Sequence, residues 1–239
     1  MPNELEFEDT FDGDELDTSK WLPYYLPHWS SRDRSRARYE ISGGLLRLLI
    51  EEDQLPWCPE FDDGIRVSSL QTGEFAGPLG SEVGQHRFNP TAVVREEQEK
   101  VGLYTPQYGR IEVRCKATDD PRSMVALWMI GYGDTPERTS EICVCEIFGR
   151  EGAPDHALVG VGVHPFGDPR IRDDFSKVRV PIDARDFHVY RADWTPDQVE
   201  FFVDDNLVKT VDQSADYPMQ LMLDIYEFPS EHGDEPRGD

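Results

Sequence analysis

Two glutamates lie five residues apart in the short apolar segment Ser140–Phe148, as Glu141 and Glu146. In a regular strand the side chains alternate between two faces, which would place Glu146 in the layer of apolar side chains. Because burial of an unpaired carboxylate is costly, we expect one extra residue, a β-bulge, near Val144–Cys145. The bulge returns Glu141, Cys143 and Glu146 to one face. Two carboxylates on one face are the minimum equipment for hydrolysing a glycosidic bond with retention.

This segment resembles the signature strand of glycoside hydrolase family 16, whose bulged pattern reads Glu-x-Asp-x-x-Glu. Glu141 and Glu146 match both glutamates of the pattern, whereas Cys143 stands at the position of the aspartate. Further stretches resemble the laminarinases and β-glucanases of the family in the same order. They are Phe11–Trp21, Tyr108–Arg114, Ala126–Met129 and Phe187–Asp204. This ordered set identifies the chain as a family member from about residue 5 to residue 226.

The resemblance implies an all-β fold, namely a two-sheet antiparallel β-sandwich of the concanavalin A-like jelly-roll type. A sugar cleft would lie on its concave sheet. Glu141 would be the nucleophile and Glu146 the general acid/base of a retaining endo-acting hydrolase of β-1,3- or mixed-linkage β-glucan. Cys143 would be a mostly neutral thiol where the family has a charge. We therefore expect reduced or re-tuned activity rather than none.

Aromatic and polar side chains are the candidates for sugar binding, because a pyranose stacks its apolar face on a ring. Trp57 lies in an irregular loop, where it is either an exposed platform or packed against the loop. Trp128 faces either the cleft or the core. His164 stands where the family commonly places a histidine in the cleft. The candidate substrate-binding residues are Trp57, Trp128, His164, Tyr104, His86 and Arg87.

No cofactor is expected for the reaction itself. The resemblance implies a structural calcium ion on the convex sheet, with Glu8 near the N-terminus as the candidate ligand. Cys143 and Cys145 are too close in an extended strand to form a disulfide without distortion. No second cysteine pair or histidine cluster follows them at the spacing of a zinc site, so we expect the four cysteines to be reduced thiols.

The composition suits one folded domain with a neutral polysaccharide as its partner. At 239 residues, with 38% hydrophobic and 11% aromatic residues, the chain can bury a core of useful size. We expect a monomeric domain over residues 1–228 and a polar tail over 229–239. The formal net charge of -24 repels phosphate backbones and anionic lipids, so neither nucleic acid nor a membrane is an expected partner.

Short β-rich segments recur between turn residues, and no long amphipathic helix is expected. The predicted strands are residues 45–50, 66–72, 108–117, 124–131, 141–148, 158–164, 187–194, 199–204 and 219–226. Turns at 195–198 and 204–206 would close successive hairpins. The irregular region 53–105, which is rich in glycine, proline and charge, is expected to form the walls of the cleft.

The sequence leaves the compartment and part of the function open. No apolar run is long enough to cross a membrane, and the N-terminus shows no signal-peptide pattern. The protein is therefore secreted if a signal peptide has been removed, and cytoplasmic otherwise. Besides hydrolysis, two alternatives remain: a transglycosylase with the same chemistry, and a non-catalytic carbohydrate-binding module in which Cys143 marks lost catalysis.

Overall fold

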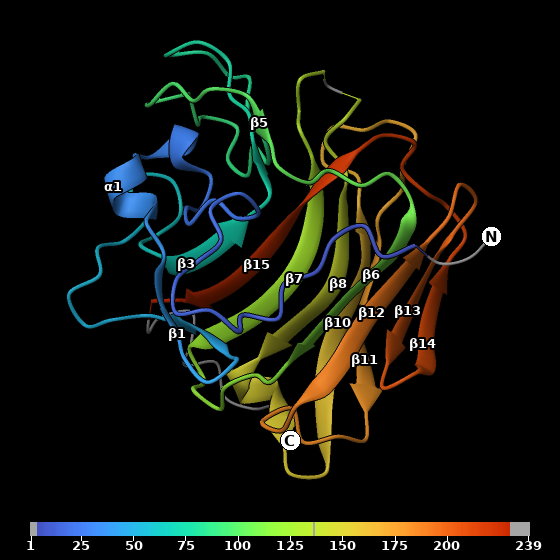
Figure 1. Ribbon diagram of the computed structural model, residues 1–239. Helices are drawn as coiled ribbons and strands as arrows, with labels where there is room; N and C mark the ends of the chain where they lie inside the picture. Colours follow the sequence, from blue (N-terminus) through green and yellow to red (C-terminus); the bar gives the residue numbers. More distant parts are fainter. Residues whose placement is uncertain (1–3, 136, 230–239) are drawn as a thin grey trace.

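Two antiparallel sheets contain most of the strand residues in the computed structural model (Figure 1). The structure describes residues 4–135 and 137–229. The tail predicted at 229–239 therefore lies outside the described residues except for Pro229. The expected fold class, an all-β jelly-roll sandwich, is confirmed.

The larger sheet carries the predicted catalytic strand near its middle. Its strand order is β11 (Asp174–Val180), β10 (His156–His164), β8 (Glu141–Phe148), β7 (Ser123–Gly131), β15 (Met219–Glu227) and β3 (Arg66–Gln71). The short strand β9 (Gly152–Ala153) pairs with β10. All of these pairings are antiparallel.

The smaller sheet and two hairpins complete the strands. The smaller sheet has the order β14 (Asn206–Val211), β13 (Val199–Val203), β12 (His188–Trp194) and β6 (Gly109–Cys115). The hairpins are β1 (Arg38–Ile41) with β2 (Leu46–Leu49), and β4 (Gly73–Glu74) with β5 (Val101–Gly102). The described helices are single turns: η1 (Pro27–Trp29), α1 (Arg32–Ser35) and η2 (Gly149–Glu151). Within the described ranges, no helix is long and apolar enough to cross a bilayer.

A main core of alternating side chains fills the space between the two sheets. From β8 it takes Ile142, Val144 and Ile147, and from β12 it takes Tyr190, Ala192 and Trp194. Each large side chain that is fully buried here contributes about 1.5–3 kcal/mol of hydrophobic stabilisation. The main core therefore fixes which face of β8 is left for chemistry.

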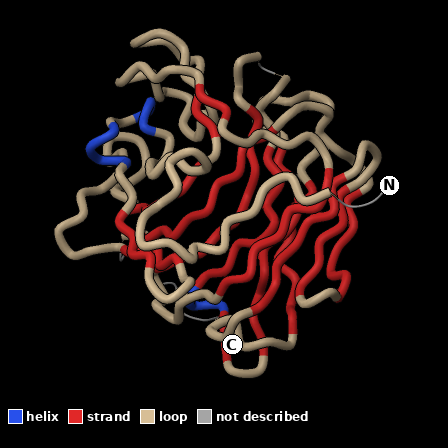
Figure 2. Tube along the Cα trace, in the orientation of Figure 1, coloured by secondary structure: helices blue, strands red, loops and turns tan. Residues whose placement is uncertain are grey.

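A second core covers part of the opposite face of the larger sheet. Its members are Tyr25, Leu26, Trp29, Trp57, Cys58, Val67, Ala92, Val94, Ala126, Trp128, Ile130, Met222 and Tyr226. Strand β7 is thus buried on both faces, which explains its unbroken apolar run Met124–Ile130. The covering segments are mainly loops, drawn in tan at the upper left of Figure 2.

The nine predicted strands are all present, with ends shifted by at most two residues. The turns at 195–198 and 204–206 are also confirmed. The sequence analysis missed the short strands β1, β4, β5 and β9, and the edge strands β11 and β14. Lys177 and Arg179 in β11 break its apolar pattern, and charges of this kind protect the edge of a sheet from further pairing.

Candidate active site

The predicted bulge in β8 is confirmed by its pairing with β7. Leu127 pairs with Cys145 and Trp128 pairs with Cys143, so Val144 is the extra residue. The pairing of β8 with β10 shifts at the same place, between Gly160 and Gly162. The hydrophobic pattern of β8 therefore sets its register, because a regular strand would have buried Glu146 in the main core.

Glu141 and Glu146, which lie on either side of the bulge, line one cavity of about 420 Å³. The complete lining is Glu141, Glu146, His164, Pro165, Phe166 and His86. β8 supplies both acids, while the end of β10 and the loop after it supply the next three residues. His86 reaches the cavity from the irregular region 53–105, as expected for a cleft wall.

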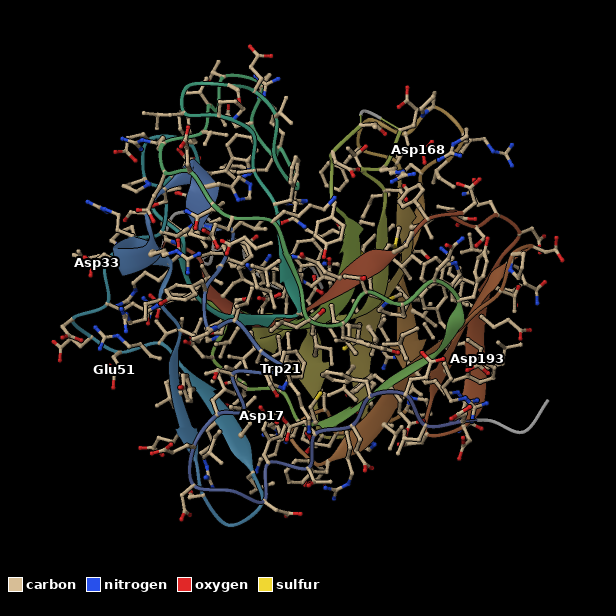
Figure 3. All side chains as sticks on the ribbon, turned by 45° about the horizontal axis from the view of Figure 1, so that its top comes forward. Asp17, Trp21, Asp33, Glu51, Asp168 and Asp193 are labelled. Carbon is tan, nitrogen blue, oxygen red and sulfur yellow. The ribbon has the colours of Figure 1, made fainter. Side chains whose placement is uncertain are left out.

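The loop that carries Pro165 and Phe166 is fastened to the start of β8. The Tyr217 hydroxyl donates a hydrogen bond of 2.9 Å to Asp168 in this loop, which is labelled at the top of Figure 3. The same hydroxyl accepts a 2.9 Å hydrogen bond from the backbone amide of Ser140. The wall of the cavity is thereby held against the residue that precedes Glu141.

Glu141 is the more buried of the two acids, with 5% of its surface exposed. The thiol of Cys143 donates a hydrogen bond of 2.8 Å to its Oε1 atom, and His86 Nδ1 lies 3.7 Å from its Oε2 atom. Burial raises the pKa of Glu141 to about 8, and the hydrogen bond from Cys143 opposes this rise. Burial also lowers the pKa of His86 to about 4, so at neutral pH the imidazole is uncharged and forms no ion pair.

Glu146 shares the thiol with Glu141. Burial raises the pKa of Glu146, while the hydrogen bond from Cys143 and the nearby side chains of His164 and Lys177 lower it. Burial, followed by the charges of both carboxylates, raises the pKa of Cys143 well above its usual value. Cys143 is therefore a neutral thiol with one proton to donate between two acids.

Another buried carboxyl group near Glu141, that of Asp224, comes from β15. Asp224 has no exposed surface, and the indole N–H of Trp128 donates a hydrogen bond to its Oδ2 atom. Burial raises the pKa of Asp224 to about 7, against hydrogen bonds from Ser69, Trp128 and Tyr226. Its negative charge adds to the rise in the pKa of Glu141. The sequence analysis missed Asp224, although an acid within the apolar run of β15 was a signal for it.

His164 lies beside the two acids in a fixed orientation. Its Nδ1 atom is 2.5 Å from Asp173 Oδ1, and its ring stacks on Phe175 at 4.8 Å. The structure thus brings two predicted substrate-binding residues, His164 and His86, into the cavity. It adds Pro165 and Phe166, which the sequence analysis did not single out.

Comparison with known proteins places this geometry in a family. The profile of the glycosyl hydrolases family 16 matches residues 103–231, which are 129 of the 239 residues. The chain belongs to glycosyl hydrolase family 16. The matched segment contains both glutamates and the bulged strand.

Two curated relatives support this membership over part of the chain. A β-glucanase of Rhodothermus marinus is 30% identical over 140 residues, which are 55% of this chain and 41% of that protein. A β-1,3-glucan-binding protein of Penaeus monodon is 34% identical over 125 residues, which are 46% of this chain and 33% of that protein. The matches span less than half the length of either relative.

Solved structures extend the likeness over almost the whole chain. A GlcNAcα1-4Gal-releasing endo-β-galactosidase of Clostridium perfringens is 30% identical with a TM-score of 0.82, covering 93% of this chain and 56% of that chain. The laminarinase of Rhodothermus marinus is 22% identical with a TM-score of 0.59, covering 94% and 86%. At this identity the laminarinase shares the fold, whereas the endo-β-galactosidase is similar in sequence as well.

In this family 16 member, the structure decides between the alternatives that the sequence left open for Trp57 and Trp128. Of the two alternatives for Trp57, the exposed platform is wrong and packing against the loop is confirmed, since only 3% of its surface is exposed. Its ring packs 4.6 Å from Tyr25 and 4.9 Å from Phe88, because the loop folds back onto the second core. Trp128 does face the concave side with Ala126, but as a buried member of the second core.

Arg87 and Tyr104 do not line the cavity. The guanidinium of Arg87 donates to the carbonyl of Ala92 and lies 2.9 Å from Glu82, so it braces its own loop. Tyr104 stacks on Phe7 at 4.6 Å and packs against the main core. Arg87 was a candidate because its loop could reach the cleft, and Tyr104 because an aromatic ring can stack on a sugar.

The residues around Glu8 are engaged within the chain. The Lys20 ammonium donates to the Glu8 carbonyl at 2.6 Å, and Asp9 accepts 2.9 Å hydrogen bonds from the Trp21 indole and the Phe11 amide. Calcium at Glu8 stays a prediction. The four cysteines are free thiols, as expected.

Proposed function

We propose that this protein is a retaining, endo-acting glycoside hydrolase of neutral β-1,3- or mixed-linkage β-glucan. The observation that carries the proposal is that Glu141 and Glu146 line one cavity with the thiol of Cys143 between them. The β-glucanase and laminarinase relatives support the substrate class. The net charge of -24 favours a neutral polymer over an acidic one.

Each acid has one role in a double displacement. Glu146 protonates the leaving oxygen while the carboxylate of Glu141 attacks the anomeric carbon, which forms a glycosyl-enzyme. Glu146, now a carboxylate, then takes a proton from the water that releases the sugar. The two carboxyl groups of a retaining enzyme are about 5–5.5 Å apart, which side chains on one face of a bulged strand can reach.

Burial gives the nucleophile a further property. With a pKa of about 8, Glu141 is mostly protonated at neutral pH, so the reactive fraction grows as the pH rises. Once ionised, the buried carboxylate is poorly solvated and interacts strongly with the positive charge that develops on the sugar. The site therefore combines a small active fraction with a strong interaction in the transition state.

A β-galactoside is the second candidate substrate. It is favoured by the similarity to the endo-β-galactosidase of Clostridium perfringens, whose TM-score of 0.82 compares with 0.59 for the laminarinase of Rhodothermus marinus. The glucan-binding relative favours a third alternative, a non-catalytic module. Two buried acids in one cavity favour catalysis, because binding of a neutral sugar alone does not need a costly carboxyl pair.

Reducing-end release from laminarin, mixed-linkage β-glucan and a GlcNAcα1-4Gal-capped glycan tests the proposal, with the isosteric Glu141→Gln variant in parallel. Cleavage of a glucan that disappears in the variant, with the β-anomer released first, supports the proposal. Cleavage of the galactose-containing glycan alone selects the second candidate. If no substrate is cut but the protein is retained on an insoluble glucan, the binding module is correct. Products longer than the substrate identify a transglycosylase.

A further inference from the structure

Three side chains of different chemistry meet at the cavity: Glu141 and His164 line it, and Cys143 is buried beside them. A carboxylate oxygen of Glu141, the sulfur of Cys143 and a ring nitrogen of His164 all lie within 4.8 Å of one another. In the part of the chain that the structure describes, these three side chains are close enough together to hold a metal ion. Two of the three are also members of the proposed catalytic strand.

The donor set is that of a zinc-class ion. Zinc binds thiolate sulfur, imidazole nitrogen and carboxylate oxygen, and a site with three protein ligands leaves a fourth position open. An aspartate at position 143, as in the family pattern, would give a harder set with two carboxylates and one imidazole. Cys143 replaces one of those oxygens by sulfur, which selects thiophilic ions over calcium and magnesium.

His164 is already held in the way that metal-binding histidines usually are. Its Nδ1 atom is hydrogen-bonded to Asp173 Oδ1, and this pairing leaves Nε2 as the nitrogen with a lone pair for a ligand. A carboxylate behind a ligating histidine fixes both the tautomer and the direction of the ring.

We propose that Glu141, Cys143 and His164 bind Zn²⁺ or another thiophilic divalent ion, and that the bound ion blocks the nucleophile reversibly. Binding itself does not depend on the proposed function, whereas inhibition does. This site is distinct from the calcium expected near Glu8, because it lies inside the active cavity.

The geometry needs only small adjustments. Bond lengths of about 2.0–2.3 Å place the donors of a tetrahedral site about 3.5 Å apart. Glu141 and Cys143 would open from 2.8 Å, and His164 would approach from within 4.8 Å. His86 Nδ1, which is buried without a hydrogen-bond partner in the described part of the chain, lies 3.7 Å from Glu141 Oε2 and borders the fourth position.

The charges balance without any oxidant. The Cys143 thiol and the protonated Glu141 carboxyl group each release a proton to solvent as their bonds to the metal form, and the ion then neutralises one thiolate and one carboxylate. The buried cavity thus gains no net charge from the bound complex. Because protons leave, binding tightens as the pH rises.

Titration with Co²⁺, a spectroscopic substitute for Zn²⁺, tests the site directly. One equivalent is expected to produce thiolate-to-cobalt charge-transfer absorption in the wild type, none in Cys143→Ser, and the wild-type signal in the matched control Cys115→Ser. Asp173→Asn should keep the absorption but weaken affinity by about 10- to 100-fold. A signal that survives in Cys143→Ser, or no signal with excess Co²⁺ in the wild type, would overturn the proposal.

Zn²⁺ inhibition of glycan cleavage tests the second half. We expect a chelator to restore the wild-type rate, and we expect Cys143→Asp to need at least about tenfold more Zn²⁺ for the same inhibition. Equal sensitivity of wild type and Cys143→Asp would refute inhibition through the thiol. Cobalt absorption without glycan cleavage would support the metal site and reject the proposed function. Glycan cleavage without cobalt absorption would support the proposed function and reject the metal site.

Discussion

Replacement of Cys143 by alanine should move the whole pH–activity profile towards alkaline pH. The thiol lowers the pKa of both Glu141 and Glu146, against the rise that burial causes. Loss of a hydrogen bond worth about 1 kcal/mol corresponds to about 0.7 pH unit. In the proposed mechanism Glu141 attacks as a carboxylate, so activity should rise as the pH passes through its pKa, which is about 8 in the wild type. Activity near pH 7 should therefore fall about fivefold in the variant and recover at higher pH.

The assay is kcat/KM on the cleaved glycan from about pH 5 to pH 10, because this ratio reports the pKa values of the free enzyme. Cys143→Ser retains one donor and should lie nearer the wild type than Cys143→Ala does. Cys115→Ala, which removes a thiol from β6 in the smaller sheet, is the matched control and should leave the profile in place. An unmoved or acid-shifted profile in Cys143→Ala would refute the argument. If the activity of the wild type already rises near the ordinary pKa of a carboxyl group, burial does not raise the pKa of Glu141.

Three other substitutions probe the surroundings of the acids. Asp224→Asn should raise the free energy of unfolding near pH 8 by up to about 4 kcal/mol, because burial raises the pKa from 3.8 to about 7 and the stability present at low pH is lost as the pH rises through that value. Urea unfolding at several pH values measures this slope. Gly160→Ala should lower kcat, because its Cβ would lie 2.5 Å from the Phe175 ring and 3.1 Å from Glu146. Gly152→Ala, whose nearest atom is 3.9 Å away, is the control. Glu146→Gln should lower kcat by about 10²- to 10⁴-fold, and less for an aryl glycoside whose leaving group needs no proton.

Each of these three predictions can be contradicted by a specific measurement. An unchanged pH slope of stability in Asp224→Asn would contradict a raised pKa for that carboxyl group. Equal losses of kcat in Gly160→Ala and Gly152→Ala would show that the crowding at Gly160 does not reach Glu146. Equal losses of kcat on the glycan and on the aryl glycoside in Glu146→Gln would show that Glu146 is not the general acid.

The register of the catalytic strand could be predicted because the conflict that determines it is local. Within one strand, an acid at position 146 and apolar residues at 142, 144 and 147 admit a single inexpensive solution, namely a bulge. Most strands of the two sheets were found for the same reason, since period-two patterns report which face is buried. Glu141 and Glu146 could therefore be placed together without any knowledge of tertiary contacts.

Residues that reach the cavity through loops could be named only as candidates. His86 and Arg87 are neighbours in sequence, yet one lines the cavity and the other braces its loop. For Trp57 the irregular loop left exposure and packing open as alternatives, and the structure buries it in the second core. The direction of such segments depends on packing between parts of the chain that are distant in sequence, which periodicity does not encode.

The second core has a consequence for how this protein can be divided. The segment that matches the family, residues 103–231, contains β7 and β15 but neither β3 nor the apolar residues between 25 and 94 that cover them. A fragment limited to 103–231 would leave a broad apolar face of its main sheet open to water, and such surfaces promote aggregation. It would also lack His86. Chimeras made by recombining family members at residue 103 therefore need to exchange the covering loops together with the sheet beneath them.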